Sequence, residues 1–319
     1  MFRAILWFVC AALSVDDDGC LLSSEPMAIT RPYAQLDDLS KFRFPQADYD
    51  EARNQRDFEC LRITYRSGGL RIVGFIYKPK QTAGRKLPAI IFNRGGTADF
   101  GAIEPQTLVT FYLWAKEGFV VLASNYRGGG GSEGVDEWGG RDVDDVMNLI
   151  PLARDLGYID MTNLFMVGLS RGGPMTYIAL RRKIPVNAAA VIAGPADLRM
   201  ERRRTEFVEG NDPEFRRIGW PGWRNVWPDF EHREAEHFAS RSAADWPGEI
   251  DVPLLLLHSR SDSLVPVEQT LKLAALLQQH KKEYELVVYS TDGHSLPRHR
   301  KDRDAHIIEW FRAHMRSGP

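Results

Sequence analysis

No part of this sequence restricts the possible folds more than the segment Gly168-Leu169-Ser170-Arg171-Gly172. It has the pattern G-x-S-x-G, and an apolar run typical of a buried strand, residues 164–167, precedes it. The residues that follow, 173–182, have the composition of a helix. A serine on a sharp turn between a strand and a helix exposes its hydroxyl above the sheet, where it can act as a nucleophile. The pattern alone also fits a glycine-rich turn without catalysis, so its partners decide the matter.

A serine hydroxyl is a weak nucleophile until a base removes its proton, and that base must be oriented by a third group. Downstream of Ser170, the apolar run 252–258 predicts a strand, and Asp262 lies in the loop after it. A second predicted strand, 284–289, leads into the loop that carries His294. In an open α/β sheet, these loops lie at the edge where ligands bind. The three side chains are therefore a candidate nucleophile, acid and base.

Other acidic and histidine residues are weaker candidates. Asp251 precedes its strand and lies at the opposite edge, whereas Asp292 is two residues from His294 and is expected to form a turn. His258 closes the strand 252–258, where a histidine is expected to be packed rather than catalytic. The remaining histidines fall in charged or helical surroundings and are His232, His237, His280, His299, His306 and His314.

Five separated segments of the chain, taken in order, each match a characteristic motif. They are residues 63–79, 125–128, 168–173, 257–266 and 293–294. In this order they resemble the leading hairpin, a strand-end signature, the nucleophile turn, the acid loop and the base loop of one family. That family is the prolyl oligopeptidase family of serine peptidases, and the resemblance covers its catalytic domain from about Phe58 onward. It implies that Ser170 is the nucleophile, Asp262 the acid and His294 the base.

Alternating strand and helix patterns predict an α/β protein with a mostly parallel sheet and helices on both faces. The resemblance implies that this is the α/β-hydrolase fold, with a catalytic domain over residues 58–319. We expect a lid insertion at about residues 198–246, because this stretch lies between the predicted strand 188–193 and the strand that precedes Asp262.

Residues 1–57 are expected to form an N-terminal leader. The apolar run 4–13 is too short to span a bilayer, and it fits a signal peptide over residues 1–14 followed by a polar segment with one helix. Cleavage would make the protein secreted or periplasmic and would leave Cys20 and Cys60 as a possible disulfide pair. Without cleavage the protein would be cytoplasmic.

Acyl transfer needs hydrogen-bond donors for a developing oxyanion. The loop after the predicted strand 87–92 contains Arg94, Gly95 and Gly96. We expect the N–H groups around Gly95 and Gly96 to form the oxyanion hole together with the N–H of Arg171. Members of the family often carry Tyr or His where Arg94 stands, so Arg94 departs from the pattern. It is a candidate substrate-binding residue instead.

Aromatic and cationic side chains near the predicted site are further candidates for substrate binding. Tyr126 and Arg127 follow a strand end, and the lid contains Trp220, Trp223 and Trp227. Tryptophans beside a cleft can form an apolar wall, and arginines can bind a substrate carboxylate. A solvated cap held together by aromatic packing fits the same residues. The lid arginines are Arg202, Arg203, Arg204, Arg216, Arg217 and Arg224.

Composition limits the partners of this chain. The 319 residues are 44% hydrophobic and carry a formal net charge of −2, which gives no electrostatic reason to expect nucleic acid. No cluster of histidine and cysteine has metal-ligand spacing, so neither a metal nor another cofactor is expected.

The predicted function is a serine hydrolase that cleaves amide bonds of small peptides through an acyl-enzyme. A carboxylesterase on the same scaffold is the alternative, favoured by Arg94 and by the lack, within these residues, of the propeller domain that larger relatives carry. A binding module without catalysis is disfavoured, because the candidate nucleophile, acid and base are all present.

Overall fold

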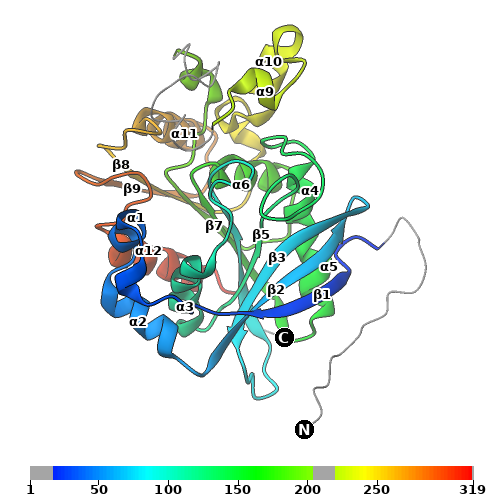
Figure 1. Cartoon of the computed structure of the whole chain (residues 1–319). Coiled ribbons are helices and arrows are strands. Elements are labelled where there is room, and N and C mark those ends of the chain that lie inside the picture. The colour runs from blue at the N-terminus through cyan, green and yellow to red at the C-terminus, as the bar shows by residue number, and fades with distance from the viewer. Residues whose placement is uncertain (1–16, 204–219, 318–319) are drawn as a thin grey trace.

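The computed structural model describes residues 17–203 and 220–317. Nine strands of these residues form one sheet in the order β1-β2-β3-β5-β4-β6-β7-β8-β9 (Figure 1). The pairs β1–β2, β2–β3 and β3–β5 are antiparallel, and the remaining pairs are parallel. The strands are β1 (Leu21–Met27), β2 (Phe58–Ser67), β3 (Leu70–Pro79), β4 (Leu87–Asn93), β5 (Val120–Ser124), β6 (Ile159–Leu169), β7 (Ala188–Ile192), β8 (Leu254–Ser259) and β9 (Tyr284–Tyr289).

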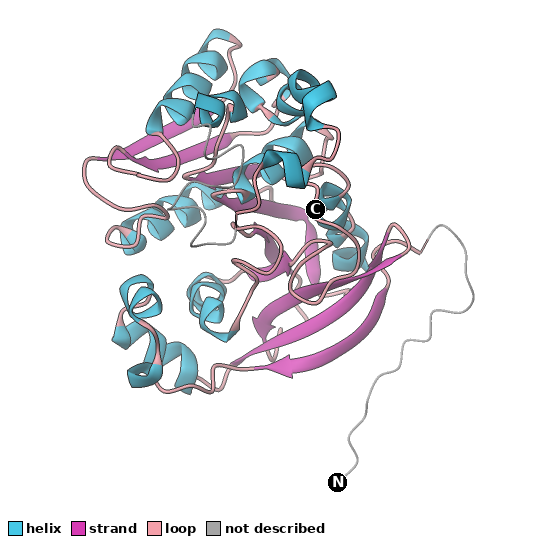
Figure 2. Ribbon diagram, turned by 45° about the horizontal axis from the view of Figure 1, so that its top comes forward, coloured by secondary structure: helices cyan, strands magenta, loops and turns pink. Residues whose placement is uncertain are grey.

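Helices cover both faces of the sheet, as Figure 2 shows. One face packs against α4, α5, α6 and α11. The other face packs against α2, α3 and α12. The helices are α1 (Asp38–Arg43), α2 (Gln46–Asn54), α3 (Leu108–Lys116), α4 (Asp142–Met147), α5 (Leu149–Asp155), α6 (Gly172–Arg181), α9 (Trp223–Val226), α10 (Phe230–Arg241), α11 (Val267–Gln279) and α12 (Arg300–Ala313). This arrangement confirms the predicted α/β-hydrolase fold class.

The central strands are short apolar runs because both of their faces are covered. Every residue of β7 and of β8 is buried, and β6 is buried over most of its second half. Parallel strands covered on both sides have this continuous apolar composition, in contrast to the alternation of a half-exposed strand. Because β6, β7, β8 and β9 run parallel, the loops after them meet at one edge of the sheet.

The segment before residue 58 is built into the domain to a greater extent than a polar leader would be. Its strand β1 pairs with β2 at the edge of the sheet. Tyr49 and Ala52 of α2 are buried in the core of the face that also packs against α3 and α12. The expected signal peptide, residues 1–14, lies outside the described residues.

The possible disulfide between Cys20 and Cys60 is not formed. Cys60 is a free, buried thiol on β2, opposite Met27 and Tyr77, whereas Cys20 lies next to Arg66 near the other end of that strand. Burial raises the pKa of Cys60 to about 12, so this thiol stays protonated and unreactive at neutral pH.

Within the stretch expected to form a lid, residues 198–246, the described helices include α9 and α10, which lie at the top of the view in Figure 1. Both are anchored to the loop that precedes α4, because Trp227 Nε1 donates to the carbonyl of Glu137 and Arg241 Nε donates to that of Trp138. None of the helices in the described ranges has the length and apolar character needed to cross a bilayer.

Candidate active site

Ser170 lies on a tight turn between β6 and α6, and its backbone adopts the left-handed conformation with φ of 55°. That conformation costs a non-glycine residue about 1–3 kcal/mol, so the surrounding packing must hold it. The N–H of Ser170 donates to the carbonyl of Ile192 on β7. A Cβ atom on Gly172 would lie 2.0 Å from the carbonyl oxygen of Asn93, which explains why glycine flanks the serine. The sequence pattern therefore corresponds to a strand–turn–helix on which the candidate nucleophile is half-buried.

Asp262 and His294, which the sequence predicts to be the acid and the base, are hydrogen-bonded to each other. Nδ1 of His294 lies 2.8 Å from Oδ2 of Asp262, and the loops that carry them follow the adjacent strands β8 and β9. The Asp262 side chain is fully buried, whereas that of His294 is 17% exposed. The backbone N–H groups of Leu264 and Val265 donate to Oδ1 of Asp262 at 2.9 and 3.0 Å. The carboxylate is thus fixed by its own loop, and the imidazole retains access to solvent.

His258, which the sequence indicates only as a packed residue, is a second histidine on the candidate acid. Its side chain is fully buried, and Nε2 lies 3.2 Å from Oδ2 of Asp262 and 3.0 Å from the carbonyl oxygen of Val265. Because a carbonyl only accepts, Nε2 carries the proton and donates toward both oxygens. Nδ1 pairs with the hydroxyl of Thr270 at 2.7 Å. The spacing of four residues between His258 and Asp262 at a strand end is the signal that could have indicated this contact.

The surroundings of Asp262 favour its charged form. Burial by itself would raise the pKa of Asp262, but hydrogen bonds from His258 and His294 and from the Val265 amide outweigh burial. Together they hold the pKa of this carboxyl well below its usual range. The carboxylate is therefore ionised at neutral pH, as an acid that orients a base must be.

The two alternative acids have other partners. Asp292 accepts hydrogen bonds from the backbone and the ring Nδ1 of His299, at 3.0 and 2.8 Å, and so orders the turn that carries His294. Asp251 pairs with Lys183 before β8, at the other edge of the sheet. Both placements agree with the sequence analysis.

Gly95 lies directly beside the candidate nucleophile. A Cβ atom on Gly95 would lie 3.1 Å from Cβ of Ser170 and 3.7 Å from its Oγ. Within the described part of the chain, the backbone N–H groups of Gly95, Gly96 and Arg171 donate to no protein acceptor. They remain available to an oxyanion. Among the contacts of the described residues there is no hydrogen bond between Oγ of Ser170 and His294. In serine hydrolases without a bound substrate this bond is often long, and it tightens only when substrate binds.

The side chain of Arg94 points into the protein rather than toward a substrate, which corrects the expectation from the sequence. It is 2% exposed, and its described hydrogen-bond acceptors are the carbonyl oxygens of Gly95, Ala98, Phe100 and Asn125. Burial, and next the neighbouring charge of Arg171, lower the pKa of Arg94 to about 10, so the guanidinium remains charged at neutral pH.

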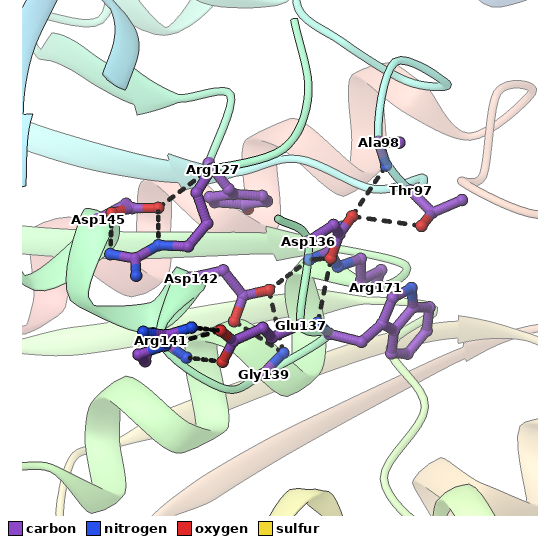
Figure 3. Close-up of polar contacts among 12 residues, drawn as sticks. Thr97, Ala98, Arg127, Asp136, Glu137, Gly139, Arg141, Asp142, Asp145 and Arg171 are labelled. Carbon is purple, nitrogen blue, oxygen red and sulfur yellow. Dashed lines mark hydrogen bonds and ion pairs between the residues drawn. The ribbon is translucent and has the colours of Figure 1, made fainter. Parts of the chain in front are cut away.

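Tyr126 and Arg127 also bind other residues of the protein and are not accessible to a substrate. Tyr126 is fully buried, and its hydroxyl donates to the carbonyl of Arg94. Arg127 binds Asp145 through a two-pronged ion pair, with Nε and Nη2 at 3.0 and 2.7 Å from the carboxylate oxygens (Figure 3). Asp145 is fully buried as well. The two expected substrate contacts are therefore used to hold the loop after β5.

The lid tryptophans are buried in an aromatic cluster, which is the packing alternative raised by the sequence. Trp223 stacks on Trp227 with ring centroids 4.2 Å apart, and both contact Phe238 of α10. Trp220 packs edge-on against Trp223 and against Trp138 of the loop before α4. These rings fasten the lid to the domain and do not form an open wall.

The arginines of the lid are only partly described. Arg224 is paired with Glu231 on the surface of α10. The side chains of Arg202, Arg203, Arg204, Arg216 and Arg217 lie outside the described residues. Within the described ranges, no group of three or more histidine, cysteine or acidic side chains is arranged to hold a metal ion.

Comparison with known proteins places this chain in a family. The family model described as the prolyl oligopeptidase family matches residues 105–318. An uncharacterised peptidase of Bacillus subtilis, YtmA, is 26% identical over 268 residues, which cover 81% of this chain and 92% of the relative.

Solved structures share the fold. An acylaminoacyl peptidase of Pyrococcus horikoshii superposes with a TM-score of 0.65 at 22% identity, over 83% of this chain and 43% of that protein. An esterase of Pyrococcus furiosus superposes with a TM-score of 0.61 at 20% identity, over 81% of this chain and 92% of that protein. The chain thus spans less than half of the Pyrococcus horikoshii peptidase.

Proposed function

The chain belongs to the prolyl oligopeptidase family of serine peptidases, and on that premise we propose that it hydrolyses amide bonds of small peptides through an acyl-enzyme on Ser170. His294 is the base and Asp262 is the acid. The observation that carries the proposal is the bond of 2.8 Å between Nδ1 of His294 and the buried carboxylate of Asp262. It leaves Nε2 as the ring nitrogen that can take the serine proton.

The reaction has two halves. His294 accepts the proton of Ser170 as Oγ attacks the substrate carbonyl, and the C–N bond of the resulting tetrahedral intermediate then breaks as the same proton passes to the leaving amine. Water attacks the acyl-enzyme with His294 again as base, and the returning proton restores the serine. Asp262 stabilises the imidazolium in both halves, while the N–H groups of Arg171, Gly95 and Gly96 donate hydrogen bonds to the oxyanion.

The same site supports a second candidate, a carboxylesterase. The specific observation is the burial of Arg94, whose guanidinium faces loop carbonyls and so adds no side-chain donor to the oxyanion hole. Fold and catalytic chemistry are shared between the two activities. An ester is easier to cleave than an amide, because its alkoxide leaves more readily than an amine. An oxyanion hole that consists only of main-chain donors is therefore sufficient for ester hydrolysis as well.

The test is hydrolysis of peptide p-nitroanilides and of p-nitrophenyl acyl esters by the purified protein, side by side with the Ser170→Ala variant. The p-nitroanilide set includes free dipeptides and N-acylated amino acids, and Ser24→Ala on the exposed strand β1 is the matched control. We expect amide cleavage that is lost in Ser170→Ala and retained in Ser24→Ala. Ester cleavage alone would establish the esterase, and failure of a fluorophosphonate probe to label Ser170 would reject both.

A further inference from the structure

Two buried arginines lie against one aromatic ring beside the candidate oxyanion hole. The guanidinium carbons of Arg94 and Arg171 are 5.1 and 5.2 Å from the ring centroid of Tyr126. Arg94 comes from the loop after β4, and Arg171 directly follows the candidate nucleophile. Both side chains are buried, and neither is needed for the chemistry assigned to Ser170, Asp262 and His294.

Arg94 donates hydrogen bonds to several carbonyl groups of its own loop. Its Nη1 donates to the carbonyl oxygens of Gly95 and Phe100, at 3.0 and 3.1 Å, and its Nη2 donates to that of Ala98 at 2.8 Å. A guanidinium presents five donors in a rigid planar fork and can hold several acceptors at once, whereas an ammonium on a flexible chain cannot fix their directions in this way.

Arg171 holds the next carbonyl of the same loop. Its Nη1 donates to the carbonyl oxygen of Gly96 at 3.2 Å, and its two terminal nitrogens bind Asp136 at 2.5 and 2.6 Å. Nη2 also binds the fully buried Asp142 at 2.5 Å. Figure 3 shows that Asp136 in turn accepts from the N–H of Ala98, at 2.8 Å. Arg171 and Asp136 therefore hold the loop from both sides.

These bonds determine where the amides of the loop point. In a trans peptide the C=O of one residue is antiparallel to the N–H of the next. With the carbonyl of Gly95 turned to Arg94, the N–H of Gly96 points away from that guanidinium. Gly96 has a φ of 79°, and a Cβ there would lie 2.0 Å from the carbonyl oxygen of Phe100, so only glycine fits this conformation.

We propose that Arg94 and Arg171 are positioning residues of the oxyanion hole: Arg94 holds the carbonyl of Gly95 so that the N–H of Gly96 faces Ser170, and Arg171 holds the carbonyl of Gly96 and so fixes the next peptide of the same loop. The inference rests on the proposed function, because it assigns a task to an oxyanion hole. Neither guanidinium touches the substrate. Asp136 is the anchor that holds Arg171 in place and bonds to the loop at Ala98.

The experiment compares Arg94→Lys and Arg171→Lys with the wild type, using the best substrate found for the protein. Removal of one oxyanion donor typically lowers kcat by 10²–10³-fold. We expect kcat to fall by about 100-fold in each variant while KM changes by less than about threefold. The inhibition constant of the matching trifluoromethyl ketone, whose hemiketal oxyanion occupies the hole, should rise in step with the loss of kcat/KM.

The matched control is Arg300→Lys, a buried arginine of α12 whose described ion-pair partners are Asp48 and Asp304. It should lower the midpoint of thermal unfolding and leave kcat unchanged. Lysine variants that are destabilised but retain wild-type kcat and wild-type inhibition by the trifluoromethyl ketone would overturn the positioning role.

A further variant keeps the test decisive if a lysine variant does not fold. Asp136→Asn retains the shape of the anchor and weakens its hold on Arg171, and we expect the same selective loss of kcat, by about tenfold. Fluorophosphonate labelling distinguishes a failure of the proposed function from a failure of the positioning role. A wild type that is not labelled at Ser170 would reject the proposed function, whereas equal labelling rates in the wild type and in all three variants would reject only the positioning role.

Discussion

The two halves of the candidate active site are built in opposite ways. On the acid–base side, the carboxylate of Asp262 is held by amides two and three residues further along its own loop. On the oxyanion side, Arg171 binds groups that are 29, 35 and 75 residues away, on Asp142, Asp136 and Gly96. One half has a carboxylate ordered by its own loop and a single contact, to His294, that spans 32 residues, whereas the other is a network of several buried charges and loop carbonyls.

The two halves also differ in how their buried charges are paired. The acid–base side places one buried carboxylate against two histidines, His258 and His294. The oxyanion side buries two guanidinium groups, of which Arg171 binds two carboxylates and Arg94 binds carbonyl oxygens, and burying such charges is costly unless every partner is present. We therefore expect mutations on the acid–base side to act mainly on catalysis, and mutations on the oxyanion side to act on stability as well.

The largest effect should come from the nucleophile and the base. Ser170→Ala and His294→Ala should each lower kcat by at least about 10⁴-fold, as in other enzymes where these residues act as a unit. Thermal unfolding of both variants should stay close to that of the wild type. Steady-state kinetics with the preferred substrate check this, and near-normal turnover in either variant would remove the proposed assignment.

Asp262→Asn should lower kcat by around 10⁴-fold, because an amide no longer favours the correct tautomer of His294. Asp292→Asn serves as the matched control, since Asp292 orders the turn and bonds to His299 instead. A larger loss of kcat in Asp292→Asn than in Asp262→Asn would show that the acid has been misassigned.

On the oxyanion side, Asp142→Ala should lower the free energy of unfolding by about 3–5 kcal/mol, because it leaves the buried Arg171 with one carboxylate fewer. Asp251→Ala removes an exposed partner of Lys183 and should cost less than about 1 kcal/mol. Urea unfolding of the two variants measures the contrast. Equal losses would contradict the difference between the two halves.

His258→Phe should lower kcat by about tenfold, because it removes a donor to the charged Asp262 without touching His294. His258→Asn retains a side-chain donor and should lose less. Comparing kcat of the two variants distinguishes a hydrogen bond to Asp262 from simple packing. If His258 only fills space, the bulkier, apolar phenylalanine should be tolerated better than asparagine.

The smallest expected effect is on acid stability. The pKa of Asp262 is lowered in the folded protein, so the carboxylate contributes stability that is present above its unfolded pKa of about 3.9 and is lost as pH falls toward its folded pKa. The difference in unfolding free energy between wild type and Asp262→Asn should therefore be constant near neutral pH and shrink below about pH 4. A difference that grew on acidification would contradict the lowered pKa.

Much of the fold and the acid–base side could be predicted from the sequence because their signals are local. Apolar runs for β6, β8 and β9 are followed by short loops, so the order of Ser170, Asp262 and His294 fixes their common edge once the sheet is parallel. One helix was expected before residue 58, but the strand β1 was not, because a short edge strand carries too few apolar residues to be distinguished from a polar leader.

The substrate-binding candidates failed for a different reason. Arg94, Tyr126, Arg127 and the lid tryptophans are polar or amphipathic residues, and their type is the same whether they contact a ligand or a buried partner. Their partners, such as Asp145 for Arg127 and the loop carbonyls for Arg94, lie in segments that only folding brings together. Residue type therefore indicated that these positions matter without indicating what they contact.

The sequence by itself determined the strand–turn–helix around Ser170, the chain order of the candidate acid and base, and the family, since all of these depend on neighbours along the chain. Tertiary structure alone decided that His258 donates to Asp262, that Arg94 faces inward, and that Arg171 joins the nucleophile turn to Asp136 and Gly96. The physical reason is that a buried charge must find its partners in three dimensions, and the identity of those partners is not encoded at any fixed spacing.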